Sequence, residues 1–202
     1  MRVALADDSA LFRQGMRLML TAASMEVTVE ARTGAELLAR VRDDPPDAAI
    51  LDIRMPPTFT DEGLRTAHDL REQLPSVGVL VLSTYAETSY AVRLLGDGEG
   101  GVGYLLKDRV DDVATLCDAL GRVTRGEAVV DPDIVRRLFT RRRSRGVLDE
   151  LTHRERLVLK LLAEGPSDAG IAGRRPRGAH LRAGPESYRG RYRALGPLLR
   201  RS

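Results

Sequence analysis

The feature that most constrains this chain is a short apolar segment that ends in an acid, Ala48–Leu51 followed by Asp52. An uninterrupted apolar run of this length is typical of a strand that is buried on both faces of a sheet. A turn that contains Pro56 and Pro57 comes next. An acid at such a strand end should lie at the carboxyl edge of the sheet, where open α/β folds place their functional groups.

The same pattern occurs near the N-terminus, where the apolar segment Val3–Ala6 is followed by Asp7 and Asp8. If the two strands are neighbours, three carboxylates converge at one edge, and like charges at close range favour a bound proton or cation. All-oxygen ligands suit a hard ion such as Mg²⁺. Taken singly, however, each acid is more often a helix cap or a turn residue.

Strand and helix patterns alternate five times in the first part of the chain. Strands are expected at 3–6, 27–31, 48–51, 77–82 and 104–106, and helices at 9–22, 33–41, 61–74, 87–95 and 110–125. This order predicts an α/β fold, a doubly wound five-stranded parallel sheet with helices on both faces. The first helix carries Leu11, Phe12, Leu18 and Met19 at helical spacing.

Right-handed crossovers place all strand ends of such a sheet on one edge. The residues expected to meet there are Asp7, Asp8, Asp52, Ser83 and Lys107. The acids can hold Mg²⁺, while the lysine and the hydroxyl can contact the oxygens of a phosphoryl group. Ser83 and Thr84 are adjacent hydroxyls, and only one of them can face the site from a strand because side chains alternate.

Three stretches, ADDS at 6–9, LDIRMP at 51–56 and GYLLKD at 103–108, resemble the signatures of a response-regulator receiver domain. With LTHRER at 151–156, the chain resembles the NarL/FixJ subfamily, which adds a LuxR-type helix-turn-helix. The resemblance implies a flavodoxin-like receiver fold and a phosphorylation-activated regulator of transcription. Its implied partners are a histidine kinase, DNA and, after phosphorylation, a second copy of the chain.

The resemblance also implies a role for each matching residue. Asp52 is the implied phosphoacceptor. Asp7, Asp8, Asp52 and the backbone carbonyl of Arg54 are the implied Mg²⁺ ligands. Lys107 would contact the phosphoryl group, Ser83 would be the switch hydroxyl, and Tyr104 would be a switch aromatic that moves inward. The glycine-rich stretch at 96–101 looks longer than the usual turn, either as a tolerated surface insertion or as a change to the signalling face.

Charge divides the chain into an acidic and a basic part. Residues 1–125 hold 14 Lys+Arg against 20 Asp+Glu, whereas residues 126–202 hold 18 against 9. We predict a receiver domain at 1–125, a helix and basic linker at 126–148, two helices of a helix-turn-helix at 149–174, and an irregular tail at 175–202. A single cysteine, with no signal-peptide pattern and no membrane-spanning run, leads us to expect a cytoplasmic protein.

The tail does not look like a DNA-recognition helix. Pro185 falls where a third helix should run, and an interior proline costs about 3 kcal/mol or more. From residue 174 onward, 9 of 29 residues are arginine, and this Arg/Gly/Pro-rich text resembles a frameshifted reading of a GC-rich gene. The C-terminal module is therefore expected to be small, all-α and incomplete. The competing hypothesis is a divergent but working helix-turn-helix.

The favoured function is a two-component response regulator that accepts a phosphoryl group on Asp52 and is not a turnover enzyme. One alternative is a receiver whose output is interaction only, because the DNA-binding module is defective. The alternative from the enzyme class is a haloacid-dehalogenase-type phosphatase, which also uses a nucleophilic aspartate, Mg²⁺ and a lysine. That family separates its two aspartates by one residue, whereas Asp7 and Asp8 are adjacent.

Overall fold

The computed structural model describes residues 1–96, 100–110 and 112–143, so predictions for residues 97–99, 111 and 144–202 lie outside the described residues. The strands are β1 (Arg2–Ala6), β2 (Glu26–Ala31), β3 (Ala48–Asp52), β4 (Gly78–Ser83), β5 (Val102–Leu106) and β6 (Val129–Val130). The helices are α1 (Ala10–Ala22), α2 (Gly34–Val41), α3 (Glu62–Gln73), α4 (Thr88–Gly96), α5 (Val113–Thr124) and α6 (Pro132–Arg143), with a 3₁₀ turn, η1, at Lys107–Arg109.

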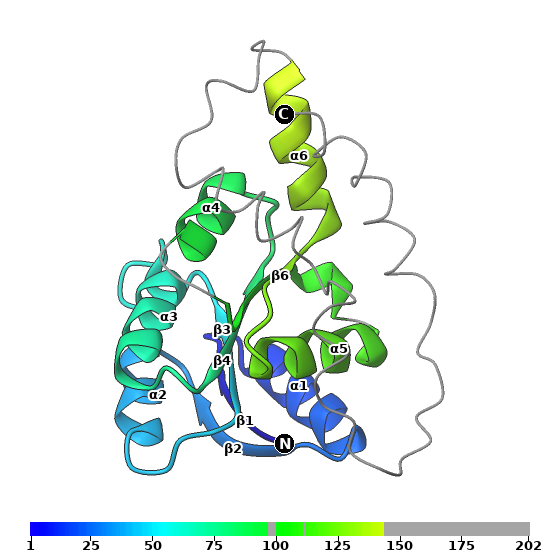
Figure 1. The fold of residues 1–202 in the computed structure, drawn as a ribbon. Coiled ribbons are helices and arrows are strands. Elements are labelled where there is room, and N and C mark those ends of the chain that lie inside the picture. The colour runs from blue at the N-terminus through cyan, green and yellow to red at the C-terminus, as the bar shows by residue number, and fades with distance from the viewer. Residues whose placement is uncertain (97–99, 111, 144–202) are drawn as a thin grey trace.

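The described strands form one parallel sheet in the order β2-β1-β3-β4-β5-β6 (Figure 1). This arrangement confirms the predicted doubly wound α/β fold. The prediction had five strands, and the structure adds β6 beside β5. A strand of two residues is too short to produce a recognisable alternation in the sequence, which is why it was missed.

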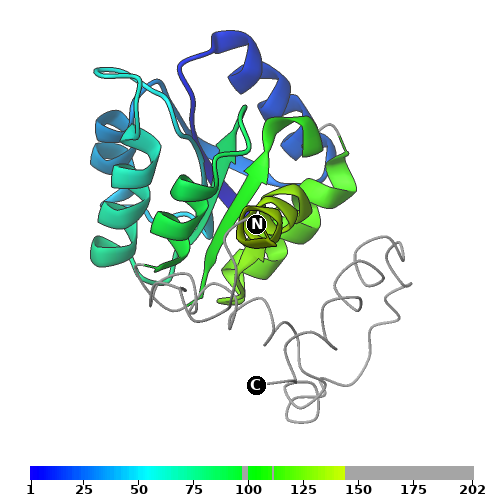
Figure 2. The ribbon, with the colours of Figure 1, turned by 90° about the horizontal axis from the view of Figure 1, so that it is seen from above.

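Helices cover both faces of the sheet, as Figures 1 and 2 show. α2, α3 and α4 pack on one face, and α1 and α5 pack on the other. Alternate residues of β1 serve the two cores: Ala4 and Ala6 face the first, and Val3 and Leu5 face the second. A strand buried on both faces needs apolar residues at every position, which explains the uninterrupted runs in the sequence.

The buried face of α1 differs from the one suggested by its apolar residues in the sequence. Met16 and Leu20 are its buried residues, whereas Leu11 is 81% exposed and Leu18 is 60% exposed. The helix therefore turns the face that includes Phe12, Met16 and Leu20 to the sheet, with a spacing of four residues. Leu11 and Leu18 share its outer face.

The sheet continues beyond Arg125, where the receiver was expected to end. After β6, the fully buried Asp131 begins α6: its Oδ1 accepts the N–H of Asp133 at 2.8 Å. Its Oδ2 accepts the N–H of Leu106 at the end of β5, at 3.3 Å. Ile134 of α6 is completely buried in the same core as α4. The start of α6 is thus part of the folded unit.

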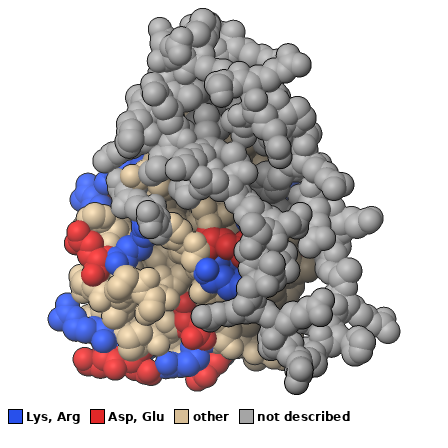
Figure 3. All heavy atoms as spheres, viewed as in Figure 1, with Lys and Arg blue, Asp and Glu red and all other residues tan. Residues whose placement is uncertain are grey.

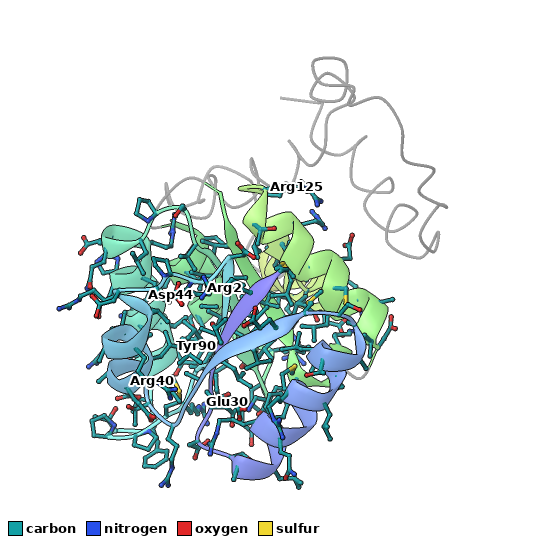
Figure 4. All side chains as sticks on the ribbon, turned by 90° about the horizontal axis from the view of Figure 1, so that it is seen from below. Arg2, Glu30, Arg40, Asp44, Tyr90 and Arg125 are labelled. Atoms are coloured by element: carbon teal, nitrogen blue, oxygen red, sulfur yellow. The ribbon has the colours of Figure 1, made fainter. Side chains whose placement is uncertain are left out.

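At the opposite, amino edge of the sheet, Arg2 connects β1 to the segment before β3. Arg2 contacts Asp44 and donates to the carbonyl of Pro45 at 3.0 Å, and its own N–H donates to Asp47 at 2.7 Å. Figure 4 views the molecule from this side and shows Arg2 beside Asp44. These contacts join β1 to the segment before β3, so the two strands enter the sheet in register. No helix in the described part of the chain is long and apolar enough to cross a membrane.

Candidate phosphoacceptor site at the carboxyl edge of the sheet

Strand register brings the predicted site residues to one edge. β1 pairs with β3 through Ala6 and Leu51, so Asp7 and Asp52 leave neighbouring strands at the same level. On the other side, β4 pairs with β5 through Ser83 and Leu106, which puts Lys107 directly after that pair. A parallel sheet with matched strand ends thus gathers Asp7, Asp52, Ser83 and Lys107, as the sequence predicted.

The Lys107 ammonium lies between two buried carboxylates. Its Nζ is 2.7 Å from Oδ2 of Asp7 and 2.9 Å from Oδ1 of Asp52. Asp7 is 1% exposed and Asp52 is 7% exposed, so both charges are largely removed from water. In this arrangement the lysine neutralises the repulsion that two close carboxylates would otherwise suffer.

Burial and charge compete at this site. Burial raises the pKa of Asp52 above the ordinary 3.8, and the hydrogen bond and charge of Lys107 offset only part of that rise. The charge of Asp7 raises it further. Burial alone would lower the pKa of Lys107, but its hydrogen bonds to Asp7 and Asp52 outweigh burial and raise it. The lysine is therefore held charged, while burial disfavours the charged form of Asp52 despite the nearby ammonium.

The other oxygens of the two acids accept backbone N–H groups. Oδ1 of Asp7 accepts the N–H of Ser9 at 2.8 Å, and Oδ2 of Asp52 accepts the N–H of Arg54 at 3.1 Å. These bonds fix the direction of each carboxylate. Gly63 makes room behind Asp52, because a Cβ there would lie 1.9 Å from the Asp52 carbonyl oxygen. This glycine, which the sequence analysis missed, lets α3 begin against the backbone of the site.

The chemistry of the buried donors suits a hard cation, since Asp7 and Asp52 offer only oxygen, while the Arg54 carbonyl stays a predicted ligand. Asp8 follows Asp7 at the same edge and is partly exposed. Across the described residues, no group of three or more His, Cys, Asp or Glu side chains is close enough to hold a metal ion. Two carboxylates are within the number that Mg²⁺ commonly uses, so the buried pair fits the ion and the role of Asp8 stays a prediction.

Two of the predicted switch residues meet at the carbonyl of Tyr85. Ser83 is 5% exposed, and its Oγ donates to that oxygen at 2.8 Å, while the neighbouring Thr84 is exposed. The Tyr104 hydroxyl donates to the same oxygen at 3.2 Å. Tyr104 is already completely buried. In this conformation the core of the α4 side already encloses the ring, and its movement on phosphorylation stays a prediction.

Arg54 connects the loop after β3 to the loop after β4. Its guanidinium is 2.7 Å from Glu87 and lies over the Tyr85 ring, 5.1 Å from the centroid. A second cation–π contact joins Lys107 to α1, where its Nζ is 4.3 Å from the centroid of Phe12. Phe12, Tyr85 and Glu87 are site neighbours that sequence reasoning missed, because their local patterns give no sign of contacts with the site.

Comparison with known proteins agrees with this geometry. The family model described as "Response regulator receiver domain" matches residues 3–120. YxjL of Bacillus subtilis, called an uncharacterized transcriptional regulatory protein, is 33% identical over 179 residues, which cover 85% of this chain and 79% of that protein. The response regulator protein VraR of Staphylococcus aureus is 30% identical over 173 residues, with the same coverage.

Solved structures give the same result. The signal receiver domain of the putative response regulator NarL from Mycobacterium tuberculosis is 33% identical, with a TM-score of 0.54, and the match covers 62% of this chain and 97% of that one. A LuxR-family two-component response regulator from Aurantimonas shares the fold, with a TM-score of 0.60 at 23% identity, over 69% of this chain and 96% of that one.

Proposed function

Because this chain belongs to the response regulators and carries their receiver domain, we propose that Asp52 accepts a phosphoryl group from a histidine kinase. The observation that carries the proposal is the buried Asp52 carboxylate with the Lys107 ammonium 2.9 Å from one of its oxygens. A reactive anion and a fixed cation at one strand edge are what phosphoryl transfer requires of a protein.

In the proposed reaction, an oxygen of Asp52 attacks the phosphorus of a phosphohistidine. The new O–P bond forms as the P–N bond breaks, and the electron pair of that bond stays on the donor imidazole. The N–H of Arg54 holds one Asp52 oxygen in place at 3.1 Å, which leaves the carboxylate pre-oriented for the attack. After the transfer, the Lys107 ammonium contacts the oxygens of the phosphoryl group, because this group adds about −1.5 to −2 charge.

Mg²⁺ is the cofactor that we propose for this site, held by Asp7, Asp52, the Arg54 carbonyl and Asp8. When bound, it supplies a positive charge that stabilises the phosphoryl oxygens. Lys107 already spans Asp7 and Asp52 at 2.7 and 2.9 Å, so the chain's own ammonium must release part of this pair when a second cation arrives. We therefore expect Mg²⁺ to bind weakly without a phosphoryl group, since two cations then compete for the same oxygens.

The outer face of α1 is the surface that we propose for the kinase. Leu11 and Leu18 are 81% and 60% exposed on it, and Gly15 between them has open space around its missing side chain. The helix begins three residues after Asp7, so its first turns stand next to the site. A phosphodonor domain with an apolar helical surface that docks here would bring its histidine to Asp52, burying side chains that otherwise face water.

The output of the phosphorylated protein is proposed to be transcriptional control, as YxjL is named a transcriptional regulatory protein. Figure 3 shows basic and acidic side chains interspersed over the described part of the visible face, which offers DNA no single-sign surface there. The excess of basic residues lies in 126–202, at 18 against 9 acids. Binding through phosphates alone would give steep salt dependence and little sequence preference, so a gel shift with promoter and scrambled DNA at physiological salt separates this output from specific readout.

The test of the proposed function is phosphorylation of the full chain by acetyl phosphate with Mg²⁺. We expect one phosphoryl group per chain, stable in acid and labile in alkali, on Asp52. Continuous release of inorganic phosphate from many phosphomonoester equivalents would instead support the rival phosphatase. With a kinase as donor, Leu11→Asp should slow transfer strongly and leave the acetyl phosphate reaction unchanged, because only the protein donor uses the outer face of α1.

A further inference from the structure

The proposed function leaves unused a contact between the Phe12 ring and the ammonium of Lys107. The ring centroid is 4.3 Å from Nζ, well within the distance at which a cation is attracted to an aromatic face. The Lys107 side chain is only 19% exposed, so water screens this attraction weakly. Asp7, Asp52 and Phe12 together occupy three sides of the same ammonium.

The first turn of α1 fixes where the Phe12 ring can lie. Oδ1 of Asp7 accepts the N–H of Ser9, and Oγ of Ser9 accepts the N–H of Phe12 at 3.3 Å. Arg13 closes the turn from the other side, donating to the Asp7 carbonyl at 2.6 Å. The position of the ring therefore depends on Asp7, the same residue that binds Lys107. The ring also packs against the core on the α1 and α5 side.

Lysine is rare in this chain, so its presence at position 107 is informative. The sequence has two lysines, Lys107 and Lys160, while all its other fixed cations are arginines. A compact ammonium can be approached by two carboxylates and a ring face at once, whereas a planar guanidinium spreads its charge and its donors over a fork. The contacts around Nζ are therefore suited to an ammonium in particular.

We propose that Phe12 is a positioning residue for phosphoryl transfer, whose ring face holds the Lys107 ammonium at the phosphoacceptor. This inference rests on the proposed function of Asp52 and adds a residue to it. Without the ring, Lys107 still has two acidic partners but can swing toward water on the side that Phe12 now covers. The transfer rate then falls because the cation is less often placed where the phosphoryl oxygens arrive.

The decisive experiment replaces Phe12 in the full chain by phenylalanines with one, two and three ring fluorines. Fluorine withdraws electron density from the ring face and weakens its attraction for a cation, while the shape of the side chain hardly changes. We expect the rate constant for phosphorylation by acetyl phosphate to fall in order along the series. The total decrease should be about fivefold, which corresponds to ~1 kcal/mol at about 1.4 kcal/mol per tenfold.

A matched control uses the same three analogues at Phe59, which is 52% exposed in the loop after β3. That series should leave the rate constant unchanged. A second readout needs no phosphoryl group: with Lys160→Arg and ¹³C-labelled lysine, the Cε resonance belongs to Lys107 alone. Its protons should be shifted upfield by the Phe12 ring, and Phe12→Leu should remove that shift.

Outcomes separate this inference from the proposed function. A rate constant that stays constant or rises along the Phe12 series, in a protein that is phosphorylated normally, overturns the role of the ring. Absence of an upfield shift in the wild-type protein overturns it as well. Failure of the wild-type protein to accept any phosphoryl group would instead defeat the function assigned to Asp52, whatever the lysine spectrum shows.

Discussion

Two buried aspartates of this chain, Asp52 and Asp131, have similar surroundings but different backbone contacts. For both, burial is the first cause of a pKa raised above 3.8, and both lie within ion-pair distance of a cation, at 2.9 Å for Lys107 and 3.6 Å for Arg109. Asp52 accepts one backbone N–H, from Arg54. Asp131 accepts two, which cap α6 and secure the end of β5.

The difference lies in what remains available to a reactant. Asp52 is 7% exposed, and the oxygen that faces Lys107 is held only by a side chain. Asp131 is 0% exposed, and each of its oxygens is occupied by the backbone. The reactivity proposed for Asp52 therefore depends on an oxygen that only a side-chain ammonium contacts, whereas both oxygens of Asp131 already accept backbone N–H groups.

The largest expected contrast is in phosphorylation. Asp52→Asn should abolish incorporation from acetyl phosphate, because the amide is not a nucleophile for phosphorus. Asp131→Asn should still be phosphorylated on Asp52, since the substitution leaves β3 and its carboxylate unchanged. Intact-mass measurement of both variants with circular dichroism as the folding control decides this, and an undiminished phosphoryl group on Asp52→Asn would refute the site.

The next contrast is in stability. Asp131→Ala removes the acceptors of the Leu106 and Asp133 N–H groups and leaves Arg109 without one of its acids, so the free energy of unfolding should fall by about 2–3 kcal/mol. Asp52→Ala should cost less, because burial already penalises the charged form of that acid. Urea denaturation of both proteins measures the difference. Equal losses would mean that Asp52 is as structural as Asp131.

A smaller effect is expected when Lys107 is replaced by arginine and Arg109 is replaced by lysine. Lys107→Arg should reduce the acetyl phosphate rate constant by about tenfold, or ~1.4 kcal/mol, because a fork cannot occupy the place of a compact ammonium between two carboxylates. Arg109→Lys loses the contact with Asp133, now 2.8 Å, and should change stability more than rate. Quenched phosphorylation time courses and urea titrations measure the rate and the stability of both variants. A larger rate effect for Arg109→Lys than for Lys107→Arg would contradict the different roles given to the two cations.

The sequence predicts some of the contacts of Asp52 and Lys107 but not others. Asp52 and Lys107 were predictable because strand ends of a parallel sheet meet at one edge, a rule that needs only the order of the elements. The contact of Phe12 with Lys107 was not, since it joins residues nearly a hundred positions apart and depends on how α1 is rotated. The exposure of Leu11 and Leu18 depends on that same rotation.

Some structural requirements leave no local trace at all. Gly63 is needed because the backbone of Asp52 comes close to it, and a glycine near the start of a helix gives no hint of that approach. β6 is formed by two residues that pair with β5, so it exists only as part of the assembled sheet. A helix was predicted within 126–148, but the acceptor role of Asp131 for the Leu106 N–H is a tertiary contact that the sequence does not show.

The smallest expected effect is a difference in pH dependence. A carboxyl whose pKa is higher in the folded than in the unfolded protein binds more protons when folded, so its contribution to stability decreases as the pH rises above 3.8 through the raised value. Asp52→Asn removes this term. The stability of the variant relative to the wild type should therefore increase over that pH range and then level off. Asp131→Asn should have a slope of the same sign from a lower starting point, because its pKa is also raised by burial and an amide cannot replace both carboxylate contacts.

Asp112 supplies the control of opposite sign. The Thr115 hydroxyl and the Ala114 N–H lower the pKa of this exposed cap at the start of α5, so its stabilising contribution is present above 3.8 and is lost as the pH falls through the lowered value. Asp112→Asn should therefore lose stability relative to the wild type as the pH rises, opposite to Asp52→Asn. Urea unfolding of the three variants between pH 3 and pH 7, at constant ionic strength, measures the slopes. Parallel slopes for Asp52→Asn and Asp112→Asn would show that burial does not govern the charge of the phosphoacceptor.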